Sequence, residues 1–203
     1  MSVHALILAG GRGSRLGNVD KGRLRLGNQI LLDRVADRLR GAREPILVSV
    51  GPDWDGRPVP GIPLPDPDLP LGGPMAGLVA AARHLSDVGS TDLLVTVAVD
   101  TPFLPKDFVS RLVAAMADGA NAVQAAWRDD SYPTNAIWRL SALGALHAPA
   151  DSAALPHSPG KLLQQLDAGR VDWADTHDEN PFANLNTLED LTSLARRAQR
   201  PGT

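Results

Sequence analysis

In the first half of the chain, short continuous runs of apolar residues alternate with segments whose apolar residues recur at helical spacing. Short continuous apolar runs are typical of strands that are buried on both faces of a parallel sheet. Such runs cover residues 4–9, 45–51 and 92–100. Residues 30–40 and 75–85 instead carry apolar side chains at helical spacing, so helices are predicted between the strands.

The second half of the chain continues this alternation after a proline-rich segment. Helices are predicted at residues 105–119, 159–168 and 188–198, and strands at 121–127, 134–140 and 171–174. Residues 56–74 hold so many prolines that only a short extended piece fits there. Strands alternating with helices imply a mostly parallel sheet covered on both faces. We therefore expect one α/β domain over residues 1–198, with a frayed tail at 199–203.

The predicted helix at residues 30–40 separates an apolar stripe from a charged face. The stripe consists of Ile30, Leu31, Val35 and Leu39. The opposite face carries most of the charged set Asp33, Arg34, Asp37 and Arg38. This arrangement predicts a helix that buries one side against the sheet and exposes its charges.

Composition and charge exclude several classes of function. The 203 residues are 43% hydrophobic, which allows a substantial core without metals or disulfides. A net charge of −3 argues against a nucleic-acid coat or a polybasic membrane anchor. Cysteine is absent, so disulfides, cysteine zinc sites and thiol chemistry are excluded. The chain shows neither a signal-peptide pattern nor an apolar stretch near the ~20 residues that cross a bilayer, so a soluble cytoplasmic protein is expected.

The clearest candidate for a ligand-binding segment directly follows the first predicted strand. Residues 7–21 read ILAGGRGSRLGNVDK. In an open α/β sheet, ligands bind beyond the carboxyl ends of the strands. Glycines there let backbone N–H groups approach an anion, and Arg12, Arg15 and Lys21 add positive charge suited to phosphate. This segment therefore predicts a phosphate-binding loop.

Neither of two standard nucleotide loops accounts for this segment. A P-loop requires Gly-Lys-Ser/Thr after a glycine and four residues, and no such string occurs. The dinucleotide fingerprint G-x-G-x-x-G is also missed, because Gly11, Gly13 and Gly17 are spaced one residue too wide. A different kind of nucleotide loop is therefore indicated.

The string LAGGRGSRLGNVDK resembles the signature of the small nucleotidyltransferases. It is most similar to that of the molybdenum cofactor guanylyltransferases, L-A-G-G-x-x-x-R-M-G-x-D-K. Leu16 here stands in place of the methionine, and one extra residue follows Gly17. The resemblance implies a Rossmann-like three-layer α/β/α fold, with Arg15, Lys21 and Asp100 as catalytic residues. It also implies that the nucleotide is bound by Leu8, Ala9, Gly10, Gly11, Gly13 and Lys21.

A second motif that resembles this family lies in residues 65–78, PDPDLPLGGPMAGL. The family pattern has an acidic residue and then G-P-L-A-G, which Asp66 and the run beginning at Gly73 match, with methionine for leucine. A glycine-bordered loop before a helix N-terminus favours phosphate. Asp66 and Gly73 are thus assigned to the nucleotide by resemblance. A proline-rich connection with a solvated Asp66 is the alternative.

Two further motifs complete the resemblance. Asp100 follows the most apolar predicted strand, where a carboxylate can hold Mg²⁺ together with substrate phosphates, and it matches the family's D-x-P-F metal site. An Asx turn or a helix N-cap is the alternative. NLNTLEDL (184–191) is similar to N-x-N-T-P-E-D. There, the resemblance implies that Asn184 completes the metal shell or binds a phosphate oxygen, and Asn186 and Thr187 are expected to cap the last helix.

The resemblance implies transfer of GMP from GTP to molybdopterin with release of pyrophosphate, using Mg²⁺. Asparagine is usual near the base in this family, and its position here is Ser49, so selection between guanine and cytosine stays open. The alternatives are a cytidylyltransferase on the same pterin, a sugar-phosphate nucleotidyltransferase and a silent nucleotide-binding partner. Transient contact with cofactor-insertion proteins or molybdoenzymes is implied, and a monomer is expected. Lys161 and Arg170 are expected to be solvated surface charges.

Overall fold

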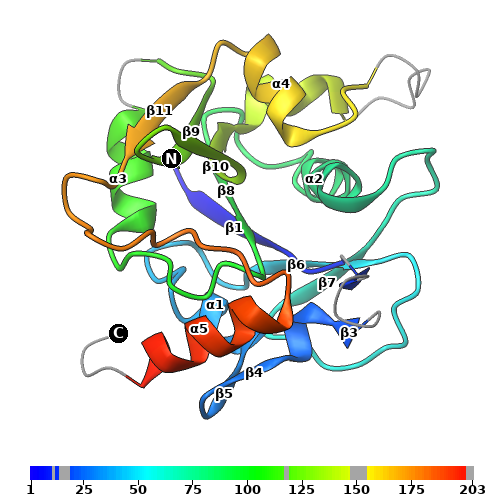
Figure 1. The fold of residues 1–203 in the computed structure, drawn as a ribbon. Helices are drawn as coiled ribbons and strands as arrows, with labels where there is room; N and C mark the ends of the chain where they lie inside the picture. Colours follow the sequence, from blue (N-terminus) through cyan, green and yellow to red (C-terminus); the bar gives the residue numbers. More distant parts are fainter. Residues whose placement is uncertain (11, 14–18, 117–118, 147–154, 200–203) are drawn as a thin grey trace.

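The computed structural model describes residues 1–10, 12–13, 19–116, 119–146 and 155–199. At its centre lies a seven-stranded sheet in the order β11-β9-β10-β8-β1-β6-β7 (Figure 1). The strands are β1 (Val3–Leu8), β6 (Leu47–Gly51), β7 (Ile62–Pro65), β8 (Leu93–Ala98), β9 (Ala122–Trp127), β10 (Asp130–Arg139) and β11 (Gly169–Asp172). β1 is parallel to β6 and β8, β6 to β7, and β9 to β11, whereas β10 is antiparallel to both neighbours. The predicted mostly parallel sheet is confirmed.

Helices cover both faces of this sheet (Figure 1). One face carries α1 (Leu31–Ala36), α3 (Phe108–Ala115) and α5 (Leu188–Ala198), and the other carries α2 (Gly73–His84), α4 (Pro159–Gln165) and the 3-10 helix η3 (Leu140–Leu146). In β1, Ala5 and Ile7 pack in the first layer, whereas Leu6 and Leu8 pack in the second. Because strand side chains alternate between faces, the unbroken apolar run fills two cores. The expected three-layer α/β/α architecture is confirmed.

Small elements that the periodicity did not predict fill the connection between β1 and α1. They are β2 (Arg12–Gly13), β3 (Val19–Asp20), η2 (Lys21–Arg23), β4 (Arg25–Leu26) and β5 (Gln29–Ile30). Pieces of two or three residues are too short to show a period of side chains. Of these elements, η2 packs against α1 and β4 packs against α5.

The helix expected at residues 30–40 is shorter than predicted, and Arg34 departs from its expected place. α1 ends at Ala36, after which the chain continues in turns. Arg34 is buried, its Nε donates to the carbonyl of Pro102 at 3.1 Å, and its guanidinium lies 4.9 Å from the centre of the Phe103 ring. The expectation that Arg34 faces solvent was therefore wrong, because the connection after β8 offers it an acceptor and an aromatic face.

The proline-rich segment contains a single strand, β7, at the edge of the sheet. An edge strand tolerates Pro63 and Pro65 because one side of its backbone needs no partner. This is the short extended piece that the prolines allowed. β10 begins earlier than predicted, at Asp130, so that residues expected in a connection belong to a hairpin with β9.

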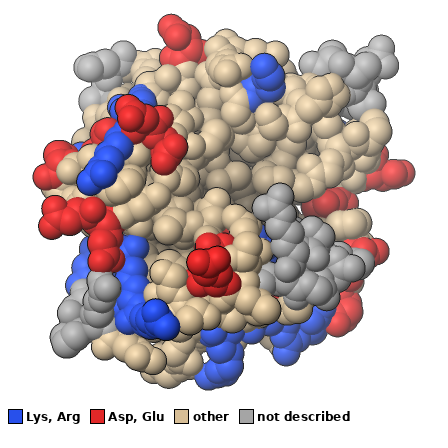
Figure 2. Space-filling view, viewed as in Figure 1, with Lys and Arg blue, Asp and Glu red and all other residues tan. Residues whose placement is uncertain are grey.

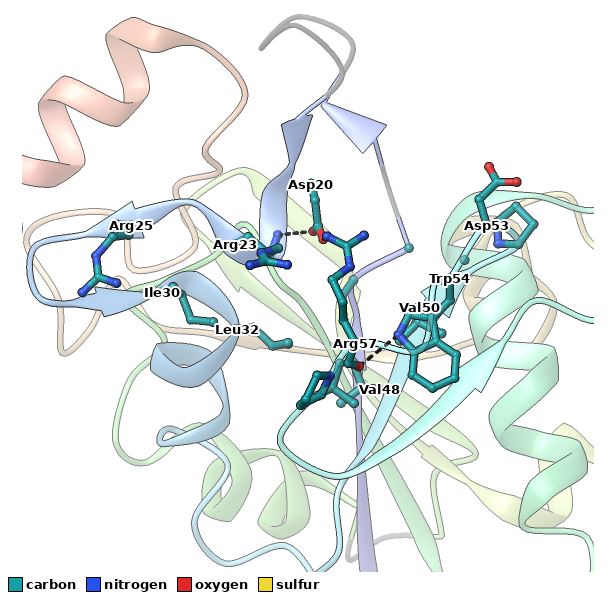
Figure 3. Close-up of a pocket in the computed structure, with 17 residues that line it drawn as sticks. Asp20, Arg23, Arg25, Ile30, Leu32, Val48, Val50, Asp53, Trp54 and Arg57 are labelled. Carbon is teal, nitrogen blue, oxygen red and sulfur yellow. Dashed lines mark hydrogen bonds and ion pairs between the residues drawn. The ribbon is translucent and has the colours of Figure 1, made fainter.

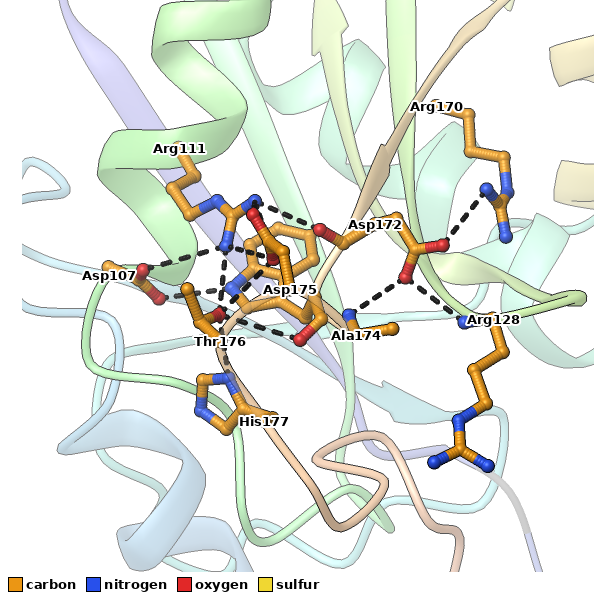
Figure 4. Close-up of polar contacts among 10 residues, drawn as sticks. Asp107, Arg111, Arg128, Arg170, Asp172, Ala174, Asp175, Thr176 and His177 are labelled. Atoms are coloured by element: carbon orange, nitrogen blue, oxygen red, sulfur yellow. Dashed lines mark hydrogen bonds and ion pairs between the residues drawn. The ribbon is translucent and has the colours of Figure 1, made fainter.

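A long segment returns from β11 to α5 across the ends of the strands, and Figure 4 shows how its start is anchored. Arg111 of α3 donates to the Asp172 carbonyl at 2.9 Å and to the Asp175 carboxylate at 3.1 Å. Its guanidinium also lies 4.8 Å from the centre of the Trp173 ring. Further along, the fully buried Phe182 packs on the Trp173 ring at 5.2 Å. These contacts fix the path of the segment that carries Asn184 and Asn186.

The charged side chains are unevenly spread over the surface. On the face seen in Figure 2, Lys and Arg gather along the lower edge, over the region of β4 and β5. Within the described ranges, no helix has both the length and the apolar character needed to span a bilayer. The domain bounds of 1–198 and a tail at 199–203 stay a prediction, since residues 200–203 lie outside the described part.

Candidate active site

The carboxyl ends of three strands bring the predicted site residues to one edge of the sheet. In the strand register, Leu8 of β1 lies opposite both Ser49 of β6 and Ala98 of β8. The backbone N–H of Val99 donates to the Leu8 carbonyl at 3.2 Å, so the carboxyl ends of β1 and β8 lie side by side. The chain therefore leaves β1 and β8 at the same place, so Gly10 and Asp100, each two residues beyond its strand, lie at the same edge of the sheet.

Lys21 and Asp100 form an ion pair at this edge. Lys21 Nζ lies 2.8 Å from Asp100 Oδ2, and the two side chains are only 14% and 16% exposed. Lys21 is placed by η2, which is capped by the Asp20 carboxylate accepting from the Gly22 N–H at 3.0 Å. A partly buried pair of this kind is screened by water less than a surface pair. The two residues that the resemblance marked as catalytic thus meet directly.

Asn186 joins this pair from the other end of the chain. Lys21 Nζ also donates to Asn186 Oδ1 at 2.6 Å. An ammonium group has three N–H donors, and the described residues accept from two of them, which leaves one for a ligand. Asn186 was expected to cap the last helix, but in the structure its side chain accepts from Lys21 instead. Sequence spacing alone did not indicate the contact, because the two residues are 165 positions apart.

The helix cap itself is formed by Thr187, as expected. Thr187 and Asp190 make a reciprocal capping box at the start of α5, and the Asn186 N–H donates to the same carboxylate at 2.9 Å. Although burial raises the pKa of Asp190, hydrogen bonds from the Asn186 and Thr187 N–H groups and the Thr187 side chain lower it below its ordinary value. The ionised cap keeps Asn186 pointed toward Lys21.

A small cavity of about 200 Å³ lies next to the ion pair. Its lining includes these residues marked in the sequence: Leu8, Gly10, Lys21, Ser49, Gly73, Asp100 and Asn184. Asn184 is brought there by the return segment, in which the Leu185 N–H donates to the Asp100 carbonyl at 2.9 Å. Four separate motifs therefore converge on one space. Asp100 is the one acidic residue among the described residues that line it.

Two glycines, one lining this cavity and one packed against Ser49, allow chain segments to approach closely. A Cβ on Gly10 would lie 2.6 Å from the backbone N of Gly51, and a Cβ on Gly77 would lie 2.5 Å from Ser49 Oγ. Both distances are too short for any larger residue without movement of the backbone or of Ser49. Gly10 of the first motif and Gly77 of the second thus have a packing reason, which is the close approach of neighbouring chain segments.

Other marked residues lie elsewhere or are outside the described part. Ala9 lines a second, larger cavity, and Asp66 lines neither cavity. Gly13 belongs to β2 and pairs with Val19 of β3. Gly11 and Arg15 fall outside the described residues. Their assignment to the nucleotide therefore stays a prediction.

Asp66 has an unusual environment for a carboxylate. It directly follows β7, and its buried Oδ1 has no hydrogen-bond partner within the described chain. Burial raises the pKa of this carboxyl above its ordinary value. A buried acceptor without a donor costs free energy, so a ligand that supplies an N–H or O–H would be favoured here.

We expect Asp66→Asn to raise the melting temperature at pH 7 by roughly 1–2 °C, because it removes a partly buried charge. With a raised pKa in the folded state, protonation of Asp66 stabilises the fold below its unfolded pKa of ~3.9, and this stability is lost as pH rises through the folded pKa. The gain should therefore shrink toward pH 4, which thermal melts at several pH values can follow.

The same variant should bind GTP about tenfold more weakly if Asp66 accepts a hydrogen bond from the nucleotide. Asp68→Asn, two positions along and exposed, is the matched control and should change neither quantity. A higher melting temperature of Asp66→Asn with unchanged GTP affinity would show that Asp66 does not contact the nucleotide.

Asn135 is a site residue that the sequence interpretation missed. It is fully buried in β10, and its Oδ1 accepts from the Ala98 N–H at 2.9 Å. Thr101 Oγ1 donates to the Ala98 carbonyl at 2.7 Å. Together these bonds fix the turn that presents Asp100. The signal in the sequence was an asparagine directly before the apolar residues AIW of the predicted strand.

Comparison with known proteins identifies similar sequences along most of the chain. The sequence profile described as "MobA-like NTP transferase domain" matches residues 5–169. A molybdenum cofactor guanylyltransferase of Cereibacter sphaeroides is 35% identical over 200 residues, covering 97% of this chain and 99% of that protein. One of Rhodobacter capsulatus is 36% identical over 202 residues, covering 98% of each chain.

Solved structures with the same fold are more distant in sequence. Molybdopterin-guanine dinucleotide biosynthesis protein A from Archaeoglobus fulgidus superposes with a TM-score of 0.71 at 21% identity, covering 97% of this chain and 98% of that one. The 2-C-methyl-D-erythritol 4-phosphate cytidylyltransferase of Thermus thermophilus gives a TM-score of 0.69 at 21% identity, covering 98% of this chain and 100% of that one. These similarities establish the fold.

Proposed function

The chain belongs to the MobA-like NTP transferase domain family, and from this premise we propose that it transfers GMP from GTP to molybdopterin. The product is molybdopterin guanine dinucleotide, and pyrophosphate is released. The names of relatives that are 35% and 36% identical over nearly the whole chain favour GTP over CTP or a sugar phosphate.

One observation in the structure supports catalysis independently of the family name. Lys21 lies at the exit of β1 between Asp100 and Asn186, at 2.8 and 2.6 Å, beside the cavity that contains Gly10 and Gly73. A purely nucleotide-binding partner would need cations and backbone donors but not a carboxylate among the phosphates. The ion pair therefore supports catalysis over silent binding.

In the proposed reaction, an oxygen of the terminal phosphate of molybdopterin bonds to the α-phosphorus of GTP. The bond between the α-phosphorus and the bridging oxygen breaks, and the electron pair leaves with pyrophosphate. No general base is needed, because a phosphate monoester with a second pKa of about 6 is already an anion at neutral pH. The protein's task is positioning and charge neutralisation.

The residues of this chain supply those two effects. The remaining N–H of Lys21 donates to a phosphate oxygen, and Asn186 orients the ammonium group. The proposed backbone donors to the phosphates are N–H groups of residues 9 to 17, together with Arg15, by the family pattern; of these, the Ala9 N–H already donates to the Ser49 carbonyl at 3.0 Å. Ser49 and Asp66 are assigned to the nucleoside. These roles are proposals that rest on the motif matches and the cavity lining.

The donor set fits a divalent cation, and we propose Mg²⁺. Within the described ranges, no cluster of three or more His, Cys, Asp or Glu side chains is arranged to hold a metal. Mg²⁺ does not require one, because it is commonly held by one or two carboxylates together with substrate phosphates. Asp100 would hold it through the oxygen that Lys21 does not occupy, with Asn184 as a second candidate ligand. The bound ion would neutralise phosphate charge.

Other expectations stay predictions at this point. They are a monomeric state, a cytoplasmic location, and transient contact with cofactor-insertion proteins or molybdoenzymes. The substrates are proposed to be GTP and molybdopterin, with no nucleic-acid or membrane partner.

The test is pyrophosphate release from each nucleoside triphosphate in the presence of molybdopterin and Mg²⁺. We expect release from GTP at a rate at least tenfold above that from CTP, ATP or UTP. A parallel thermal-shift series measures binding alone, because a ligand at a hundred times its Kd stabilises the fold by about 2.7 kcal/mol. A preference for CTP in both assays would overturn the guanylyl assignment, and binding without release would overturn catalysis.

A further inference from the structure

The ring of Phe103 is contacted by two cations from different helices. The Arg34 guanidinium of α1 lies 4.9 Å from the centre of this ring, and the Arg197 guanidinium of α5 lies 4.4 Å from it. A guanidinium over an aromatic face is attracted by the electrons of the ring, most strongly where water is excluded. Phe103 and Arg34 are both buried. Phe103 therefore joins α1 and α5 to the segment that follows β8.

The same three parts of the chain carry the residues that meet at the ion pair. Asp100 comes three positions before Phe103. Lys21 lies in η2, which precedes α1, and Asn186 comes two positions before the start of α5. The parts that meet at the Lys21 ammonium group therefore meet again at Phe103. Two contacts between the same three parts restrict their relative movement more than one contact does.

Backbone hydrogen bonds connect α1 to the element that places Lys21. The Leu24 N–H donates to the Lys21 carbonyl at 3.1 Å, and the Leu31 N–H at the start of α1 donates to the Leu24 carbonyl at 2.9 Å. Leu32 of α1 and Arg23 of η2 line the larger cavity, which measures about 840 Å³ (Figure 3). Because α1 and η2 are connected in this way, a displacement of α1 would displace Lys21.

Arg34 also holds the backbone between Asp100 and Phe103. Its Nε donates to the Pro102 carbonyl at 3.1 Å. The carbonyl of Asp100 accepts from the Leu185 N–H at 2.9 Å. The segment that carries the Asp100 carboxylate is thus fixed from α1 and from the chain that leads to α5.

Arg197 fixes the far end of α5. Its guanidinium donates to the Asn180 carbonyl at 2.7 Å, and its Nε lies 3.4 Å from a carboxylate oxygen of Glu179. The capping box already fixes the first turn of this helix, so α5 is held at both ends. Asn186, directly before the cap, is thereby kept at a defined place beside Lys21.

A buried arginine at this place is difficult to explain by stability alone. Burial, and after it the charges of Arg38 and Arg197, lower the pKa of Arg34 below its ordinary value, so its surroundings disfavour the charge. Within the described ranges, Arg34 has no carboxylate partner. Apolar side chains can often replace buried charges without loss of stability. What a guanidinium adds is directional contact, because it combines a flat face with N–H donors in fixed positions.

Arg34, Phe103 and Arg197 are together named the Phe103 cluster. We propose that this cluster positions the Lys21–Asp100 pair for the reaction, a role that rests on the proposed function. None of the three is among the described residues that line the smaller cavity, so they act through the pair and not on the substrate. Catalysis by positioning is sensitive to such support, because a shift of about 1 Å can lower a rate a hundredfold.

Arg34→Met tests this proposal, because methionine keeps an unbranched apolar side chain without the charge or the donors. We expect kcat for pyrophosphate release to fall about tenfold while KM for GTP changes by less than about twofold, since only the geometry of the reacting groups is affected. Phe103→Leu removes the ring instead of the charge and should give the same result. It decides the question if Arg34→Met fails to fold.

Arg38→Met is the matched control. Arg38 follows Arg34 by four positions and its charge acts on Arg34, but within the described ranges its guanidinium contacts no aromatic ring and donates to no carbonyl. The variant removes the same charge from the same region, so kcat should stay within about twofold of the unmodified protein. Equal losses in Arg34→Met and Arg38→Met would reduce the effect to general charge and overturn the proposal.

The double variant Arg34→Met/Asp100→Asn shows whether the cluster acts through the ion pair. A role in general stability would lower kcat with or without the pair, so the two losses would multiply. A positioning role has nothing left to act on once the pair is lost, so kcat should lie within about twofold of Asp100→Asn alone. Multiplied losses would overturn the proposal.

A measurement without substrate separates this proposal from the proposed function. The chain has three lysines, Lys21, Lys106 and Lys161, so replacing each of the last two by arginine assigns their ammonium signals in NMR spectra of nitrogen-labelled protein. We expect the Lys21 ammonium protons to exchange with water about threefold faster in Arg34→Met, because a less firmly held pair opens more often.

Unchanged exchange of the Lys21 protons in both Arg34→Met and Phe103→Leu would overturn the positioning role, whatever the activity of the protein. Faster exchange in both variants, with normal exchange in Arg38→Met, would support it. If the unmodified protein releases no pyrophosphate, the proposed function alone is overturned, and the exchange rates still decide whether the Phe103 cluster positions the pair.

Discussion

Asp100→Asn is expected to lower kcat for pyrophosphate release about a hundredfold or more, with the fold intact. Asparagine preserves the shape of the side chain but removes the negative charge that pairs with Lys21 at 2.8 Å. It also removes the carboxylate proposed to hold Mg²⁺ against the phosphates. Loss of one such charge contact at a reacting centre typically costs about 3 kcal/mol of barrier. The measurement is the rate of pyrophosphate release at saturating GTP and molybdopterin.

Asp87→Asn provides the matched control for this variant. Asp87 is exposed after α2, and among the described residues its side chain contacts only Ser86 Oγ, at 3.4 Å, so its replacement should leave kcat unchanged. Circular dichroism and thermal melts should show that both variants fold. Should Asp100→Asn retain more than half of the activity, Asp100 has no part in neutralising the phosphates.

Much of the fold follows from the sequence for a definite physical reason. β1 and β8 are buried on both faces, so they appear as unbroken apolar runs, and parallel strands of this kind require helical crossovers. α5 was predicted with its bounds at 188–198, because a capping threonine and two acidic residues mark its start. Arg34 could not be predicted, since its burial depends on Pro102 and Phe103, which are distant in sequence.

The candidate site was partly predictable on the same grounds. Asp100 comes two residues after the end of the most apolar strand, so its position at the edge of the sheet follows from sequence order. The Lys21–Asn186 bond could not be predicted, because it depends on the path of the segment between β11 and α5. The larger cavity was missed for a similar reason. Its walls come from β6, η2, α1 and the 52–59 segment, and no single stretch of sequence has its composition.

Lys21→Ala is expected to reduce kcat by a factor of about a hundred or more, and this is the second large effect. The substitution removes the cation from the centre of the Asp100–Asn186 arrangement and takes away the N–H left for a phosphate oxygen. Lys161→Ala is the control, because Lys161 is exposed and contacts Gln164 at 3.3 Å. It should keep full activity, as a solvated surface charge would.

The double variant Lys21→Ala/Asp100→Asn distinguishes a joint role from two separate ones. Residues that act as a unit show strongly non-additive losses, so the double variant should be about as slow as the slower single variant. Independent roles would instead multiply the two losses to about ten-thousandfold or more. The 2.8 Å contact predicts the first result, because removal of either partner leaves the other without its counter-charge. Multiplied losses would mean that the ion pair seen here is not the arrangement in which the reaction proceeds.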